Sequence, residues 1–93
     1  MPLIYRVENA GKQVEKQILK LPRPMRNRVA RAILDLEKNP RPPGCAKLVD
    51  GIYRIHVGNY RVIYKILDRE RLVLIGKVAK KRSYIYDDVD RLF

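Results

Sequence analysis

Residues 51–64 constrain the fold of this chain more than any other segment. Apolar and polar residues alternate there over two short runs, and Gly58-Asn59 lies between the runs. Alternation with a period of two predicts β-strands. A glycine followed by an asparagine suits the two-residue turn of a hairpin, of type II′ with glycine first. We therefore expect a β-hairpin at the centre of the fold.

A two-residue turn fixes which residues face each other across the hairpin. Val57 then lies opposite Tyr60. His56 lies opposite Arg61, and the pairing continues outward in the same register. One face is predicted to be aromatic and β-branched, suited to cover helices. The other face carries cations, namely Arg54, His56, Arg61 and Lys65. Because neighbouring cations repel each other, this crowding indicates a place for an anion.

Two helices are predicted on either side of a proline-bearing turn. The first would be capped by Asn9 and run to about Leu21, and the second would start at Pro22–Pro24 and end at Asn39-Pro40. Strands are expected over 3–7 and 72–79, and a short helix over 87–93. The order β-α-α-β-β-β-α predicts an α+β fold, with an N-terminal αα-hairpin on one face of an antiparallel β-sheet.

The last strand is expected to bring more cations to the basic side of the hairpin. A two-residue turn at Arg69-Glu70 would place Val78 beside Arg61, with Lys80 beyond it on the basic side. The same register would turn Lys77 toward the core. Basic residues interleaved with aromatic ones are typical of single-stranded RNA binding. Such a series lies near the hairpin tip in Lys80, Lys81, Arg82, Tyr84 and Tyr86.

The charge balance favours a polyanionic partner. The chain has 93 residues, with 21 Lys and Arg against 10 Asp and Glu, which gives a net charge of +11. Nucleic acid is the leading class of partner, ahead of an acidic protein and of an anionic membrane surface. The length predicts a single domain over residues 1–93.

The composition argues against a metal or cofactor site. The chain has one His and one Cys, Cys45, so a zinc site would lack its ligands and no internal disulfide is possible. No apolar run approaches the roughly 20 residues of a membrane span, and the N-terminus has no signal-peptide pattern. We expect a cytoplasmic protein that uses no metal and no cofactor.

Four segments carry a resemblance to a known family. They are residues 33–40, Lys47-Leu48, residues 53–64 and residues 80–86. The most specific is the block Tyr-Arg-Ile-x-Val-Gly-x-Tyr-Arg-Val-Ile-Tyr over 53–64. Along nearly its whole length, the chain resembles the RelE/ParE superfamily of toxins. The resemblance implies the toxin of a type II toxin–antitoxin module, neutralised by an acidic and partly disordered antitoxin.

Two different activities occur in the superfamily that the chain resembles. RelE-type members cut mRNA in the ribosomal A site, whereas ParE-type members poison DNA gyrase. Ala79-Lys80-Lys81-Arg82 stands where many members have a Gly-His-Arg-like element, so Lys80 or Arg82 would supply the acid. Tyr86 would stack on a base. Carried across by position, the nuclease surface falls on Arg54, His56, Arg61, Lys80 and Tyr86, with Arg82 beside them, and these side chains favour RelE over ParE.

RNA cleavage without a metal needs a base for the 2′-OH, cations for the transition state and an acid for the leaving oxygen. His56 is the expected base, because neighbouring cations should lower its pKa and keep it neutral near pH 7. Arg61 would clamp the transition state through its planar fork, and Arg54 would orient the phosphate. Contacts to mRNA or the ribosome are expected from Lys47, Lys65, Lys81, Tyr84, Arg28 and Arg31.

Two other functions fit the same residues. A ParE-like gyrase inhibitor would be indifferent to the loss of His56. A non-catalytic RNA-binding module would bind with steep salt dependence and would cleave nothing. Single residues also have plainer interpretations: His56 as a surface residue of the strand, Arg61 as a nucleic-acid contact without catalysis, and Tyr86 as a core ring.

Overall fold

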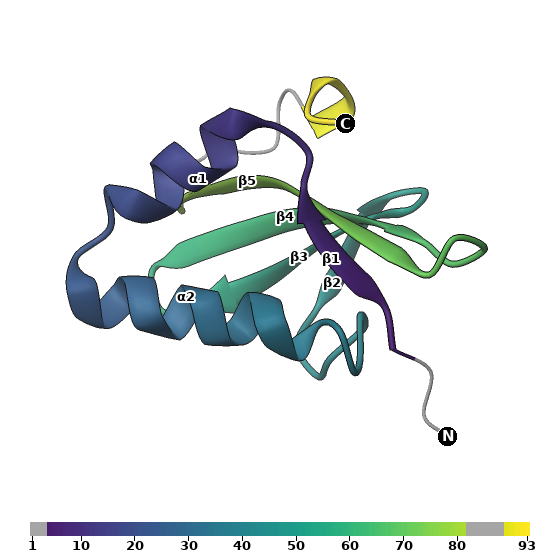
Figure 1. Ribbon diagram of the computed structural model, residues 1–93, viewed down its shortest axis with the longest axis horizontal. Helices are drawn as coiled ribbons and strands as arrows, with labels where there is room; N and C mark the ends of the chain where they lie inside the picture. Colours follow the sequence, from purple (N-terminus) through teal and green to yellow (C-terminus); the bar gives the residue numbers. More distant parts are fainter. Residues whose placement is uncertain (1–3, 82–88) are drawn as a thin grey trace.

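Two helices cover one face of a five-stranded sheet in the computed structural model, which describes residues 4–81 and 89–93 (Figure 1). The strands lie in the order β1-β5-β4-β3-β2 across the sheet. This arrangement confirms the predicted α+β class. Along the chain the elements are β1 (Arg6–Asn9), α1 (Lys12–Leu19), α2 (Arg23–Asp35), β2 (Ala46–Val49), β3 (Ile52–Val57), β4 (Tyr60–Leu67), β5 (Leu72–Lys80) and the 3₁₀ turn η1 (Val89–Arg91).

The sheet differs from the prediction at both edges. β2 pairs antiparallel with β3 and adds a strand that the sequence pattern did not indicate. β1 lies at the other edge and pairs with β5 in parallel, with Arg6 opposite Leu72. The sheet is therefore mixed and not wholly antiparallel. A parallel neighbour is possible because both helices and three strands separate β1 from β5 along the chain.

α1 begins later than predicted because Asn9 belongs to β1. Gly11 is the N-cap and no side chain caps the helix, so the cap predicted at Asn9 is wrong. At the other end, the guanidinium of Arg26 donates hydrogen bonds to the carbonyl oxygens of Leu19 and Leu21, at 3.3 and 3.2 Å. These bonds satisfy carbonyl groups at the end of α1. They also hold the Arg26 side chain of α2 in place.

α2 begins and packs as predicted. Pro22 is its N-cap and a proline lies in the first turn, where a missing N–H costs no hydrogen bond. Val29 and Leu36 are buried, and Met25 and Ile33 pack half-buried against the same core. In the described part of the chain, no helix is long and apolar enough to cross a lipid bilayer.

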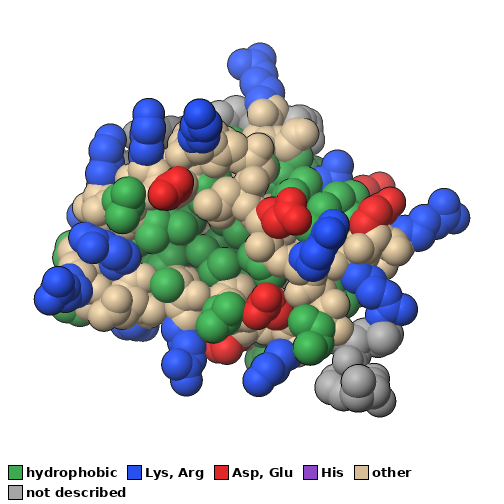
Figure 2. Space-filling model, in the orientation of Figure 1, with side chains coloured by type: hydrophobic (Ala, Val, Ile, Leu, Met, Phe, Trp, Pro, Cys, Tyr) green, Lys and Arg blue, Asp and Glu red, His purple; other side chains and the backbone are tan. Residues whose placement is uncertain are grey.

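The core lies between the helices and the sheet (Figure 1). A smaller apolar cluster on the other side of the sheet joins Ile52 and Ile63 to Val89, with Phe93 packed against it. From the helix side, Figure 2 shows apolar side chains gathered between the two helices, with Lys and Arg around them. The main core consists of Val14, Leu21, Val29, Leu36, Ile55, Val57, Val62, Tyr64, Ile66, Val73, Ile75 and Val78.

The hairpin of β3 and β4 has the predicted register, pair for pair. Gly58 has a φ of 59°, whereas Asn59 is not among the residues with positive φ, as a type II′ turn requires. The tip of the hairpin rests on α2. A Cβ added at Gly58 would lie 2.9 Å from Cε of Met25 and 3.3 Å from Nη1 of Arg28.

A β-bulge in β5 changes the register halfway along its pairing with β4. Gly76 is the extra residue, and beyond it Arg61 lies opposite Ala79 in place of the expected Val78. A Cβ at Gly76 would lie 2.5 Å from Cζ of Phe93. Glycine at this position therefore makes room for the C-terminal residues as well as for the bulge.

A polar network ties the proline-rich loop between α2 and β2 to the turn between β4 and β5. The carboxylate of Asp68 accepts hydrogen bonds from the Tyr5 hydroxyl at 2.6 Å and from both terminal nitrogens of Arg41, at 3.2 and 2.8 Å. In the same loop, the carbonyl oxygen of Pro40 accepts a bond of 2.7 Å from the buried hydroxyl of Tyr64. The hydrogen bonds from Arg41 and Tyr5 lower the pKa of Asp68 to about 2.

Gly58→Ala is expected to lower the free energy of unfolding by about 1–3 kcal/mol, since alanine is strained at positive φ and its methyl group would press on Met25. Gly44→Ala is the matched control, because Gly44 also has a positive φ, 88°, with no heavy atom within 4 Å of an added Cβ. Chemical denaturation measures both variants. Equal losses would show that the contact with Met25 contributes nothing.

Asp68→Asn is expected to change how stability responds to acid. A carboxyl group with a lowered folded pKa stabilises the protein above its unfolded pKa, and this stabilisation disappears as the pH falls from about 4 to about 2. The variant should therefore have a lower Tm than the wild type at pH 7. Its Tm should also fall less than that of the wild type when the pH is lowered from 4 to 2. Glu70→Gln, in the same turn, is the control. A wild-type acid response in Asp68→Asn would contradict the role of the network.

Candidate functional site

The face of the sheet opposite the helices gathers cationic side chains from β3 and β4. Arg54 and His56 alternate along β3 and point to the same side as Arg61 of β4, which lies directly opposite His56. No His side chain, which would be purple, is visible on the face that Figure 2 shows. We call the surface formed by Arg54, His56, Arg61, Lys77 and Lys81 the basic face.

The bulge decides which lysines of β5 belong to the basic face. Lys77 lies opposite Ile63 and therefore shares the face of His56. Lys80 lies opposite Tyr60, on the helix side of the sheet. Its predicted position on the basic face is therefore wrong. Lys77, which the sequence pattern predicts to face the core, lies on the basic face for the same reason. A glycine inside a strand is the one signal that could have indicated the bulge.

Lys81 follows β5 and brings its charge to His56. Its backbone N–H donates a hydrogen bond of 2.9 Å to the carbonyl oxygen of Asn59, so the chain is fixed beside the hairpin turn. The charge of Lys81 contributes to lowering the pKa of His56. Of the two neighbouring lysines, Lys81 and not Lys80 therefore lies near His56, the expected base. The sequence predicts Lys81 only as an RNA contact.

The pKa of His56 is lowered below its ordinary value of 6.5, as predicted. Partial desolvation is the largest cause, followed by the charges of Arg54, Arg61 and Lys81. The side chain is nevertheless exposed at the surface. A neutral imidazole at pH 7, accessible from solvent and surrounded by cations, can accept a proton next to a bound anion.

Arg61 is buried, with 6% of its surface exposed, and it supports the hairpin turn. Its Nη1 donates hydrogen bonds to the carbonyl oxygens of Tyr60 at 2.9 Å and Gly58 at 3.3 Å. Its other N–H groups make no hydrogen bond to any residue that the structure describes. Arg61 therefore has a fixed position and donors left for an anion.

Arg54 connects the basic face to the proline-rich loop. Its Nη1 donates a hydrogen bond of 3.2 Å to the carbonyl oxygen of Gly44. The side chain is half-buried, so it is held between the loop and the strand. The position of Arg54 consequently depends on the loop that Arg41 and Asp68 fasten.

The remaining predicted residues do not all meet at the basic face. Lys47 is exposed on β2 and pairs with Asp50 at 3.3 Å. Lys65 lies further along β4, opposite Ile52. Arg28 and Arg31 are exposed on α2, where Arg28 reaches the hairpin tip. Three predicted residues lie outside the described residues, namely Arg82, Tyr84 and Tyr86.

The carboxylates give no sign of a metal centre. Over residues 4–81 and 89–93, no three His, Cys, Asp or Glu side chains gather in a way that could hold a metal ion. Cys45 is a free thiol, half-buried just before β2. Among the residues that the structure describes, the basic face therefore offers one imidazole and several cations for chemistry.

Lys81→Ala is expected to raise the pKa of His56 toward 6.5, because it removes a neighbouring positive charge. Lys80→Ala removes the same charge from the opposite side of the sheet, and it should change the pKa of His56 less. An NMR titration of the imidazole Cε1–H resonance measures both variants. A larger shift in Lys80→Ala would contradict the register of β5.

The chain is similar in sequence to one family and in structure to several solved toxins. Residues 9–83 match the family described as "ParE toxin of type II toxin-antitoxin system, parDE". No curated protein matches the chain significantly in sequence. The RelBE2 toxin–antitoxin complex of Mycobacterium tuberculosis contains a chain of the same fold, with a TM-score of 0.74, 24% identity, and coverage of 87% of this chain and 95% of that chain.

Two further structures have the same fold. The archaeal RelE–RelB complex of Pyrococcus horikoshii OT3 matches with a TM-score of 0.74 and 28% identity, over 86% of this chain and 98% of that chain. The isolated RelE toxin of E. coli matches with a TM-score of 0.72 and 22% identity, over 96% and 99%. With most of its length matched by the family, the chain belongs to the ParE toxin family of type II toxin–antitoxin systems, within the RelE/ParE superfamily.

Proposed function

We propose that this toxin is a ribosome-dependent endoribonuclease of the RelE type, which cuts mRNA in the ribosomal A site and so stops translation. The observation that carries the proposal is the position of His56. Its pKa is lowered, its ring is exposed, and Arg54, Arg61 and Lys81 surround it. A neutral base among cations is what cleavage by the RNA's own 2′-OH requires.

The reaction follows from these groups without a metal ion. His56 takes the proton of the 2′-OH as this oxygen attacks the adjacent phosphorus. The bond from phosphorus to the 5′ oxygen breaks, which leaves a 2′,3′-cyclic phosphate and a 5′-OH. The N–H groups that Arg61 keeps for an anion would stabilise the charge on the phosphate oxygens, and Arg54 would orient the phosphate.

The leaving 5′ oxygen needs a proton donor, and three residues compete for this role. Lys80 and Arg82 are predicted by the resemblance, and Lys81 is added by its place near His56. An ammonium group with an ordinary pKa of roughly 10 is a slow acid, but it also neutralises the developing oxyanion. Tyr86 keeps its predicted role of stacking on a base.

The ribosome would supply much of the substrate's position. The basic face is open, and a surface of this kind holds flexible RNA poorly by itself. The predicted contacts at Arg28, Arg31, Lys47 and Lys65 are spread over α2, β2 and β4, as a footprint on a large RNA would be. Positive charges steer the toxin to such a target from a distance.

An acidic antitoxin is the second partner that we propose. The net charge of +11 favours an acidic protein. The solved relatives from M. tuberculosis and P. horikoshii are complexes of toxin and antitoxin. An antitoxin that covered the basic face would exclude mRNA from it.

Inhibition of DNA gyrase is the alternative, and the family match favours it, because the matched family is that of ParE toxins. In this case the protein would bind gyrase and would not catalyse a reaction itself. The basic face would then contribute charge alone, and a neutral, polar replacement of His56 would leave the toxin active.

Primer extension on mRNA bound to programmed ribosomes tests the two functions. Cuts confined to the A-site codon are expected, and His56→Gln should slow them by a factor of about 10²–10⁴, the usual contribution of a general base. Arg61→Lys keeps the charge but loses the planar fork, so it should also slow cleavage. Circular dichroism checks that each variant is folded.

Uncut mRNA in the presence of folded, ribosome-bound protein would contradict the nuclease. A gyrase supercoiling assay then decides the alternative. Inhibition of supercoiling that is equal for the wild type and His56→Gln would establish the ParE-like function.

A further inference from the structure

Cations from α2 and β5 lie around the hairpin tip, which consists of Gly58 and Asn59. On the helix side, Nη1 of Arg28 lies 3.3 Å from the position of a Cβ added at Gly58. Lys80 is exposed on the same side, level with the first residue of β4. On the basic face, Lys81 lies beside the tip, because its N–H donates a hydrogen bond of 2.9 Å to the carbonyl oxygen of Asn59. The tip therefore has positive charge on both sides of the sheet.

The main chain of the hairpin tip also favours an anion. The carbonyl oxygen of Gly58 accepts a hydrogen bond of 3.3 Å from Arg61, and that of Asn59 accepts the bond from Lys81. The N–H groups of Gly58 and Asn59 donate to no residue that the structure describes. Both residues are exposed. The tip thus offers main-chain donors, while its carbonyl oxygens are occupied, and such a turn suits the oxygens of an anion.

The cations around the tip have no acidic partner among the described residues. The ion pairs found there lie on β1, between the proline-rich loop and the β4–β5 turn, and beside β2. Like charges gathered around one turn repel each other. A bound anion would relieve this repulsion.

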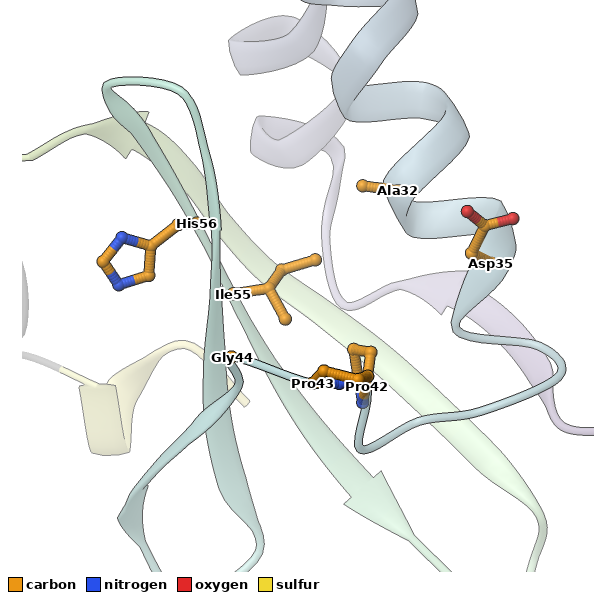
Figure 3. Close-up of a pocket in the computed structure, with 7 residues that line it drawn as sticks. All are labelled: Ala32, Asp35, Pro42, Pro43, Gly44, Ile55 and His56. Carbon is orange, nitrogen blue, oxygen red and sulfur yellow. The ribbon is translucent and has the colours of Figure 1, made fainter.

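A groove between β3, α2 and the proline-rich loop (Figure 3) continues toward the tip. Pro42-Pro43 and Ile55 make its far end apolar, whereas Arg28 and Arg31 line the end near the tip. Asp35 also lines the groove, about two turns beyond Arg28 along α2. Since this carboxylate would repel an anion, we expect the anion at the tip and not deeper in the groove.

The distance from the tip to the expected base corresponds to about one nucleotide. Figure 3 shows the imidazole of His56 projecting away from α2, which places the ring on the basic face. Gly58 follows two residues later along the chain, so the two positions are about 7 Å apart. This distance is similar to the separation of neighbouring phosphates in an extended single strand of RNA. One strand of RNA could therefore place a phosphate at each position.

We propose that the hairpin tip binds a backbone phosphate of single-stranded RNA, one nucleotide away from the phosphate at His56 and Arg61. The proposal deepens the RNA-binding function proposed above and rests on it, but it does not depend on cleavage. Phosphate contacts fix the position and orientation of a nucleic acid on a protein. A single contact leaves the backbone free to rotate about it, whereas two contacts fix its direction across the basic face.

The cations at the tip would have different roles. Arg28 presents a planar fork that can bind two oxygens of one phosphate, and Lys80 adds a compact charge on the same side of the sheet. Lys81 lies close to both positions, because it is bonded to Asn59 and its charge acts on His56. With the backbone fixed in this way, a 2′-OH would stay within reach of His56.

The first test uses the full ¹⁵N-labelled chain and a 2′-O-methyl RNA of about six nucleotides. This oligonucleotide lacks the attacking hydroxyl, so it binds without being cut. In an NMR titration at low salt, the amide resonances of Gly58 and Asn59 should shift together with the imidazole resonance of His56. Saturation of all these shifts at the same concentration would show that one strand contacts both positions.

The salt dependence of binding gives a second readout. Arg28→Gln should reduce the slope of log K against log salt by about 0.7, the value for one phosphate contact on a single strand. Lys80→Gln should reduce it in the same direction. Arg69→Gln is the matched control, because it removes the same charge from an exposed arginine in the β4–β5 turn, at the opposite end of β4. Its slope should equal that of the wild type.

Three results would overturn the proposal. One is a titration in which the amides of Gly58 and Asn59 do not shift, and another is an equal change of slope in Arg28→Gln and Arg69→Gln. The third is a shift of these amides with a peptide of glutamates but not with the oligonucleotide, which would make the tip a site for protein carboxylates.

The outcome is independent of the test for the nuclease, because the oligonucleotide cannot be cut and no ribosome is present. A protein that binds it at the tip but leaves mRNA intact would keep this proposal and lose the nuclease. Cleavage of mRNA by a protein whose tip does not respond to the oligonucleotide would do the reverse.

Discussion

The extra residue at Gly76 in β5 sets the arrangement of charge on which the candidate site depends. Without the bulge, Lys77 would point into the core and Lys81 would lie on the helix side, because strand residues alternate between faces. With it, both lysines join the face of His56. The absence of a side chain at Gly76 also leaves room for Phe93, so the C-terminal residues and the register of β5 constrain each other. One backbone irregularity therefore links the packing of the C-terminus to the electrostatics of the site.

The proline-rich loop between α2 and β2 has a similar linking role. Asp68 and Tyr64 hold it through hydrogen bonds to Arg41 and Pro40. The loop in turn accepts a hydrogen bond from Arg54 at Gly44 and forms the apolar end of the groove. Surface loops are otherwise among the first parts of a small protein to open. The network thus fixes a side chain of the basic face and a wall of the groove together.

The sequence predicted the centre of the fold better than its edges, for physical reasons. The hairpin could be predicted pair by pair because its turn and its alternation are both local, and the apolar stripe of α2 is local as well. The parallel pairing of β1 and the short β2 depend on contacts between distant segments, which no local pattern encodes. The helix cap predicted at Asn9 was wrong because Asn9 is the last residue of β1. The places of Arg54, His56 and Arg61 on the basic face could be predicted from the hairpin. That Lys81 lies on this face and Lys80 does not is a consequence of the bulge in β5, which only a glycine within the strand could have indicated.

One strand, β3, serves three surfaces at once, and this bears on how a single fold supports different toxins. Its side chains alternate between the core, through Ile55, and the basic face, through Arg54 and His56. Beyond Arg54, its edge is not covered by β2 and faces the groove beside α2. Changes to the outward side chains alter chemistry and leave the core and the edge untouched, because the core and the basic face use side chains of different residues and the edge uses main-chain atoms. One fold can accordingly exchange a catalytic face for a binding face while its core stays the same. The two proposed functions therefore differ in what the outward side chains of β3 and β4 would do, as base and phosphate ligands for RNA or as charge alone for gyrase.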